Sequence, residues 1–173
     1  MIGGKRRLAS SVVVLVGLAS PALAGDALTT SGDILQVALP LAAAVCATHQ
    51  HRLPGYAAGF LAQTAVTQGL KHGLGGAPIN ERPNGQPQGF PSGHTAAAAS
   101  GATDLAVHCA PGNRLVAIGG TAAVALVGAS RMAADEHTAL QVVAGAALGA
   151  VSTGLDVYTT PGGGVGFSYT FPF

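Results

Sequence analysis

Basic side chains and histidines gather at three junctions between apolar stretches of the sequence. Lys71 and His72 end one apolar stretch, His94 opens the next, and Arg131 and His137 precede the last. An arginine carries a planar fork of N–H donors that fits phosphate oxygens, and a lysine adds a mobile point charge. The chain has only eight Lys and Arg residues in 173, so this gathering predicts an anion site suited to phosphate.

The run from Phe90 to Thr95 has the features of a helix start and precedes an alanine-rich stretch. Ser92 is a suitable N-cap, and Gly93 allows the backbone to come close to a ligand. The free N–H groups and the positive dipole end of such a helix suit a bound phosphate. Taken alone, the run is also compatible with an ordinary Pro-Ser-Gly turn that caps a helix.

Three motifs follow one another in a specific order. They are Arg82 followed by Pro, a Pro-Ser-Gly-His run ending at His94, and a Ser-Arg pair ending at Arg131 with His137 after five more residues. In this order they resemble the type 2 phosphatidic acid phosphatase and vanadium haloperoxidase superfamily. That pattern reads Lys, six residues, Arg-Pro; then Pro-Ser-Gly-His; then Ser-Arg, five residues, His, three residues, Asp. The resemblance covers residues 71–145.

The resemblance implies a role for each matching residue. His137 is expected to attack phosphorus and form a phosphohistidine, and His94 to protonate the leaving oxygen and then activate water. Histidine suits both roles because it titrates near neutral pH. No metal or other cofactor is expected, because three cations can neutralise the charge of the phosphoryl group. The residues expected to hold the phosphoryl oxygens are Lys71, Arg82, Arg131 and the backbone of Ser92 and Gly93.

The spacing between Lys71 and Arg82 departs from the family pattern. Ten residues separate them instead of six, and the excess is rich in glycine. A loop tolerates added length at little entropic cost, so Lys71 can still return to the site. The alternative is that Lys71 extends to solvent from a helix end.

Gln141 occupies the position of the family's Asp, four residues after His137. One helical turn brings positions 137 and 141 onto one face. The amide carbonyl can still accept a hydrogen bond from the imidazole and fix its tautomer, but it adds no negative charge. We therefore expect Gln141 to orient His137 in a slower phosphatase.

Five apolar stretches separated by turn-rich breaks predict the elements that hold these residues. Their lengths and their alanine and leucine content favour helices over strands. Hydrophobic residues make up 49% of the chain and charged residues only 9%. We predict an all-α fold, a compact bundle of about five helices, as a phosphatase domain over residues 25–160 with its active site within 71–141. The stretches span residues 34–48, 55–70, 92–108, 115–129 and 138–155, with a loop over 72–90.

The first 24 residues have the pattern of an export signal. A basic segment precedes an apolar stretch, and a small-residue cleavage site ends at Ala24. An uncleaved first transmembrane helix is the alternative. We expect a membrane-embedded bundle whose active site faces the periplasm, with Arg52 and Arg114 on the cytoplasmic side of the inner membrane. A soluble periplasmic bundle is the alternative. Cys46 and Cys109 allow at most one disulfide and are expected at cytoplasmic helix ends as apolar packing residues.

Residues 161–173 form a glycine-rich and aromatic tail. Apolar residues alternate from Val165 to Phe173 with a period of two, which predicts one strand. A single strand cannot close a barrel, so we expect the tail to pack on the bundle or lie at the membrane interface.

Together these features predict a phosphatase that acts on phosphate monoesters or lipid (pyro)phosphates at the periplasmic face. The expected partners are a phosphorylated lipid or a small phosphate ester, and membrane lipid. A net charge of +1 excludes a general nucleic-acid binder, which needs clustered basic residues. Two alternatives are a soluble periplasmic acid phosphatase of broad specificity and a membrane protein that binds lipid phosphates without catalysis.

Overall fold

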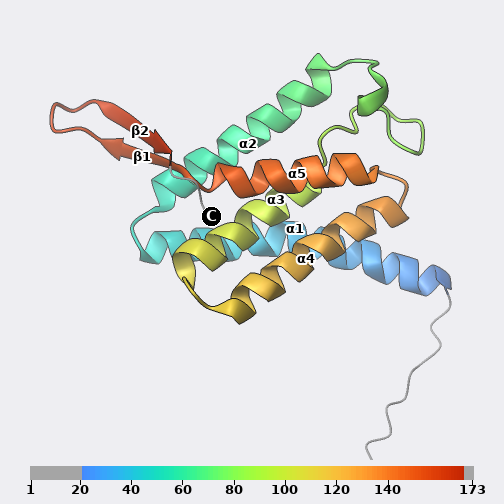
Figure 1. Ribbon diagram of the computed structural model, residues 1–173, viewed down its shortest axis with the longest axis horizontal. Coiled ribbons are helices and arrows are strands. Elements are labelled where there is room, and N and C mark those ends of the chain that lie inside the picture. Colours follow the sequence, from blue (N-terminus) through green and yellow to red (C-terminus); the bar gives the residue numbers. More distant parts are fainter. Residues whose placement is uncertain (1–20, 170–173) are drawn as a thin grey trace, which may run out of the picture.

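The computed structural model describes residues 21–169, which form five α-helices and a terminal hairpin (Figure 1). The predicted all-α bundle of about five helices is therefore confirmed. Most of the predicted leader, residues 1–20, lies outside the described residues. The elements are α1 Pro21–His49, α2 Leu53–Gly73, the 3₁₀ turn η1 Pro78–Asn80, α3 Gly93–Asp104, the π-helical turn η2 Leu105–Cys109, α4 Arg114–Ala133, α5 Ala139–Ser152, β1 Leu155–Thr159 and β2 Val165–Tyr169.

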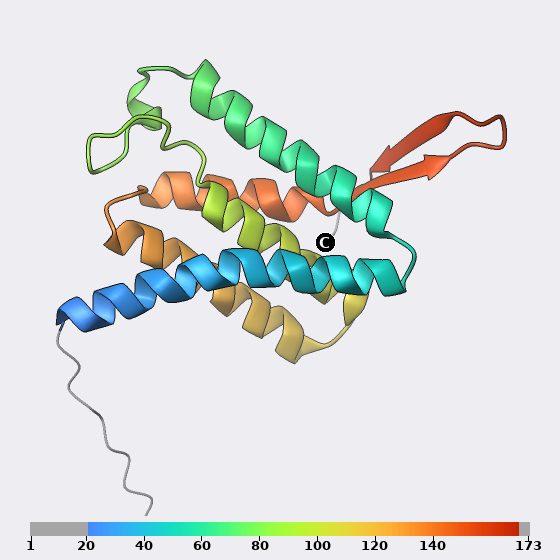
Figure 2. The ribbon, with the colours of Figure 1, turned by 180° about the vertical axis from the view of Figure 1, so that it is seen from behind.

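Helix α3 is the central element, and it contacts each of the other four helices (Figures 1 and 2). Its inner positions are small residues, among them Ala96, Ala98 and Ala102, which are all buried. Small side chains allow helix axes to approach closely, as in bundles that pack backbone against backbone. The core of this bundle is therefore built from alanine and glycine.

Two glycines of α5 bring that helix against the start of α3. A Cβ on Gly145 would lie 2.3 Å from the carbonyl oxygen of Ser92, and a Cβ on Gly149 would lie 2.0 Å from that of Ala96. Any side chain at these positions would push the two helices apart. The small-residue pattern of α5 thus fixes the position of the loop that carries the Pro-Ser-Gly-His run.

Large aliphatic side chains point outward. Ile34 is 59% exposed and Leu41 is 60% exposed on α1, and Leu115 on α4 is 81% exposed. Two segments, Gly25–His49 and Arg114–Ala133, are long and apolar enough to cross a bilayer. This exterior is compatible with association of the bundle with a membrane.

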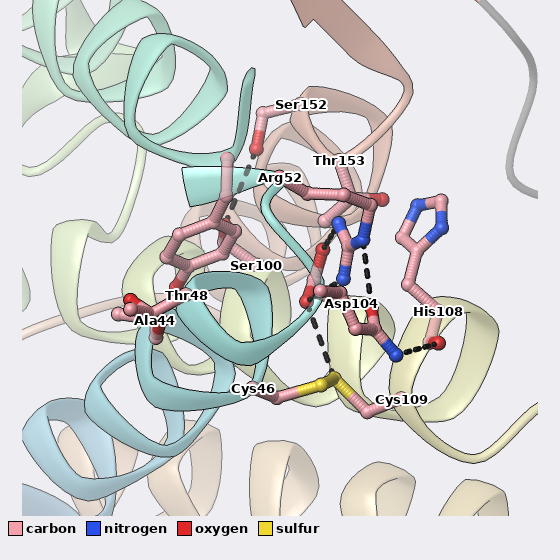
Figure 3. Close-up of polar contacts among 12 residues, drawn as sticks. Ala44, Cys46, Thr48, Arg52, Ser100, Asp104, His108, Cys109, Ser152 and Thr153 are labelled. Atoms are coloured by element: carbon pink, nitrogen blue, oxygen red, sulfur yellow. Dashed lines mark hydrogen bonds and ion pairs between the residues drawn. A yellow bond between two sulfur atoms is a disulfide. The ribbon is translucent and has the colours of Figure 1, made fainter. Parts of the chain in front are cut away.

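The two cysteines form a disulfide, so the expectation that they are separate packing residues is wrong. Cys46 at the end of α1 is bonded to Cys109 at the end of η2, with 6.2 Å between their Cα atoms. Beside it, the guanidinium of Arg52 binds Asp104 through two hydrogen bonds of 3.1 and 3.3 Å (Figure 3). Both contacts are possible because α1 lies beside α3 and beside η2, which continues α3.

The C-terminal region contains two strands where the sequence predicted one, because β2 lies in the predicted tail and β1 precedes it. The predicted last helix ends at Ser152, three residues earlier than expected, and β1 then pairs with β2 in antiparallel register, Leu155 opposite Tyr169. β1 packs beside α2, and the hydroxyl of Tyr169 donates to the carbonyl of Val151 at 2.9 Å. The tail therefore packs on the bundle as expected, but its partner strand comes from this chain. Phe171 and Phe173 lie outside the described residues.

Candidate active site

A cavity of about 380 Å³ opens at the end of the bundle where the α2–α3 and α4–α5 connections meet. It brings together residues from the end of α2, the following loop, the start of α3, the end of α4 and the loop before α5. The three cations and two histidines predicted for the site all line it. The lining residues are Gln68, Lys71, Arg82, Gly93, His94, Arg131, Glu136 and His137.

Ser92 lies behind this cavity and holds the start of α3 in place. Its hydroxyl accepts from the backbone N–H of Thr95 at 3.4 Å, as an N-cap does. Its own backbone N–H donates to the carbonyl of Gln141 at 2.9 Å, and the residue is fully buried. Of the two residues expected to offer their backbone to phosphate, Gly93 is therefore the one that lines the cavity.

Lys71 reaches the cavity in spite of the longer connection to Arg82. It is 8% exposed, and its ammonium group donates to the carbonyl of Gln88. The longer loop is closed by Asn80, whose side-chain amide donates to the carbonyls of Lys71 and Gly75 at 2.9 and 2.8 Å. The carbonyl oxygen of that amide accepts from the N–H of Phe90 at 3.1 Å. The added residues thus fold back on the end of α2.

Gln141 fixes both the position and the tautomer of His137. Its Nε2 donates to the carbonyls of Ile79 at 2.9 Å and Glu81 at 2.8 Å. Its Oε1 accepts from the N–H of Thr138 at 3.0 Å and lies 3.2 Å from Nδ1 of His137. Because an amide oxygen only accepts, Nδ1 carries the proton and the free electron pair of the neutral ring is on Nε2. This is the geometry that an orienting role requires.

The environment of His137 favours the neutral imidazole. Burial lowers its pKa from 6.5 to about 4; the charges of Lys71 and Arg82 act in the same direction, against the hydrogen bonds to Gln141 and to the Gly89 backbone. Well above this pKa the ring is neutral and its Nε2 is a free nucleophile. Burial, followed by the charge of Arg82, also lowers the pKa of Lys71 to about 8. At neutral pH Lys71 therefore remains charged in most of the molecules.

His94 and Arg131 share a carboxylate that α1 supplies. Oδ1 of Asp33 lies 3.0 Å from Nη1 of Arg131 and 3.6 Å from Nε2 of His94. Arg131 is held further by the carbonyl of Thr29 at 3.1 Å and the hydroxyl of Ser130 at 3.2 Å. Burial and then the charge of Arg131 lower the pKa of His94 below 6.5, and Asp33 acts in the opposite direction. Asp33 therefore orients Arg131 and favours the protonated form of His94.

Three functional residues were missed from the sequence. Asp33 directly precedes the uncharged stretch over residues 34–48 of α1, and an acid at the start of such a stretch was the available signal. Glu136 precedes His137 directly and forms an ion pair with Arg82 across the cavity. Asn80 carries no motif, because its role depends on how the loop closes.

A family model described as the PAP2 superfamily matches residues 13–161 of the chain. Neither a curated protein nor a solved structure matches it.

We predict that Gln141→Asp destabilises the fold even though it introduces the residue of the family pattern. A carboxylate cannot donate to the carbonyls of Ile79 and Glu81, and Gln141 is only 1% exposed. Leaving these two partly buried carbonyls without donors should lower the free energy of unfolding by about 1–3 kcal/mol. Chemical denaturation measures this. Leu140→Ala, at an exposed neighbouring position, is the control, and a Gln141→Asp variant as stable as wild type would contradict the argument.

Proposed function

The chain belongs to the PAP2 superfamily, whose members are phosphatases, and from this premise we propose that its cavity hydrolyses phosphate monoesters or lipid (pyro)phosphates through a phosphohistidine. The observation that carries the proposal is the arrangement of two imidazoles and three cations around one cavity. Lys71, Arg82 and Arg131 supply positive charge for the phosphoryl oxygens, as the transfer of a phosphoryl group requires.

In the first step, Nε2 of His137 attacks phosphorus and a P–N bond forms. The bond from phosphorus to the leaving oxygen breaks, its electron pair goes to that oxygen, and His94 donates a proton there. In the second step, His94 takes a proton from water, and the water oxygen attacks phosphorus. The P–N bond then breaks, its electron pair returns to Nε2 of His137, and phosphate is released.

This mechanism predicts an acidic pH optimum for kcat/KM, which reports the pKa values of the free enzyme. His137 must be neutral, so activity should rise as pH increases through about 4. His94 must be protonated, so activity should fall as pH rises through its pKa, which is lowered from 6.5. A pH profile with p-nitrophenyl phosphate tests this. An activity that rises steadily from pH 6 to 8 would contradict the assigned roles.

An apolar groove supports a lipid phosphate as the substrate. One hollow on α1 begins at Asp33 and extends over Ile34 and Val37 to Leu41. The carboxylate of Asp33 contacts Arg131 and His94, so this hollow begins beside the cavity. Val37 and Leu41 also line a second hollow of about 420 Å³ between α1 and α2. Acyl chains of a lipid whose phosphate lies in the cavity can follow this path, because apolar surface favours burial of hydrocarbon.

The decisive experiment compares p-nitrophenyl phosphate with a phosphatidate in detergent. We expect the wild type to hydrolyse both and His137→Ala to lose about 10³-fold or more in kcat, because the nucleophile is gone. Leu41→Gln should raise KM for phosphatidate about tenfold and leave p-nitrophenyl phosphate unaffected, since it removes apolar contact only. Leu115→Gln, at an exposed position on α4, is the matched control.

The outcomes separate the alternatives. Equal effects of Leu41→Gln on both substrates would contradict a lipid path and favour a broad-specificity phosphatase. No hydrolysis of either substrate, with no effect of His137→Ala, would favour a protein that binds lipid phosphates without catalysis.

For localisation we propose that both ends of the bundle lie outside the cytoplasm. His94 in the cavity and Cys109 in the disulfide are separated along α3 and η2 by fifteen residues, or about 20 Å of helix. Cytosolic thiols are kept reduced, so the disulfide argues against a cytoplasmic position for the end that carries Arg52. This favours the alternative of an exported periplasmic bundle, whose apolar α1 can contact a membrane surface.

The compartment is tested by trapping thiols in intact cells with a maleimide that adds mass. We expect no adduct without reductant and two adducts after reduction, since Cys46 and Cys109 are bonded to each other. Release of the protein by osmotic shock should accompany this result. Two adducts without reductant would contradict the proposal and favour helices that cross the inner membrane.

A further inference from the structure

Two carboxylates of the chain itself contact the two arginines of the cavity. Asp33 from α1 binds Arg131, and Glu136 from the loop before α5 binds Arg82. A carboxylate and a phosphoryl group present oxygens of similar geometry to a guanidinium fork. Each of these acids therefore occupies donors that the proposed substrate also needs.

The two ion pairs, Asp33 with Arg131 and Glu136 with Arg82, differ in burial and in the number of further hydrogen bonds to the arginine. The side chain of Arg131 is 7% exposed and has three partners, Asp33, the carbonyl of Thr29 and the hydroxyl of Ser130. The side chains of Arg82 and Glu136 are 26% and 36% exposed, and Nε of Arg82 is buried without a hydrogen-bond partner among the described residues. The pair between Arg82 and Glu136 is thus the one that an incoming anion can open.

The backbone presents Glu136 to Arg82 independently of the ion pair. The N–H of Glu136 donates to the carbonyl of Arg131 at 3.0 Å, and the N–H of Asn84 donates to the carbonyl of Asp135 at 3.1 Å. These bonds fix the loop before α5 against the turn that carries Arg82. The charge of Glu136 can therefore be removed without removing what holds the loop.

We propose that Glu136 sets the anion affinity of the cavity by competing with the phosphoryl group for Arg82. The inference rests on the proposed phosphatase function. A bound phosphate separates the two side chains and also meets the repulsion of a nearby carboxylate. Glu136 in this way weakens the binding of phosphate, which is also the product, and it rebinds Arg82 when phosphate leaves.

The test measures binding of inorganic phosphate and hydrolysis of p-nitrophenyl phosphate by the purified full chain at one pH. Glu136→Gln keeps the size of the side chain and removes its charge. We expect it to bind phosphate about tenfold more tightly, since both the competition for Arg82 and the repulsion are gone. The inhibition constant for phosphate as product should fall in parallel. Asp26→Asn makes the same change in net charge on an exposed acid of α1 outside the cavity lining and should leave both constants unchanged.

The possible results distinguish this inference from the function on which it rests. Weaker or unchanged phosphate binding by Glu136→Gln, in an enzyme whose wild type hydrolyses p-nitrophenyl phosphate, overturns the inference and leaves the phosphatase proposal intact. Weaker binding in particular would make Glu136 a positioning residue for Arg82. Equal tightening by Asp26→Asn also overturns it, because the effect would then be one of net charge. A wild type that neither hydrolyses the ester nor binds phosphate overturns both.

Discussion

The site depends on the hydrogen bonds of one buried amide. Gln141 joins α5 to His137, to the N-cap Thr138 and to two carbonyls of the loop after α2, while its backbone carbonyl accepts from Ser92. Three segments that are distant in sequence are therefore placed relative to one another by one residue. A side chain with both a donor and an acceptor is needed for this, since it must satisfy carbonyls on one side and an imidazole N–H on the other.

The sequence departs from the family pattern in the length of the loop between Lys71 and Arg82 and in having Gln141 in place of Asp. Because the amide both donates and accepts, these two features contact each other in the structure. The longer loop between Lys71 and Arg82 brings the carbonyls of Ile79 and Glu81 next to α5, where the NH₂ group of Gln141 binds them. An aspartate at position 141 would stabilise a positive charge on the His137 ring, but it would leave those two carbonyls without donors. In this chain the longer loop and the glutamine are therefore held together by these two hydrogen bonds. Under the proposed mechanism the cost is a less polarised imidazole, because a neutral amide does not stabilise the imidazolium that would form when His137 attacks phosphorus.

Local signals in the sequence were enough for the helices and for the motif residues of the site. Apolar periodicity and the N-cap Ser92 depend on neighbours in the chain, and His94 and His137 each lie in a motif. Contacts between residues that are far apart in the chain could not be predicted from such local signals. Asp33 is 98 residues from Arg131, and Cys46 is 63 residues from Cys109, so neither pairing could be deduced before the helices were placed. The strand β1 was missed because its five residues, LDVYT, are too short a run for periodicity to distinguish a strand from the end of a helix.

A core made mostly of alanine gains from further links between helices, and this bundle has a disulfide at one end and the contacts of Arg131 at the other. Burial of an alanine removes little apolar area from water compared with a leucine, and the buried hydrophobic residues of the described chain are mostly alanines. The disulfide closes a loop over a sequence separation of 63, which the chain-entropy model values at about 4 kcal/mol. At the other end, Arg131 ties α4 to α1 through Thr29 and Asp33. Arg131, one of the cations that we propose to bind phosphate, thus also holds two helices together and has a structural role that is independent of any substrate.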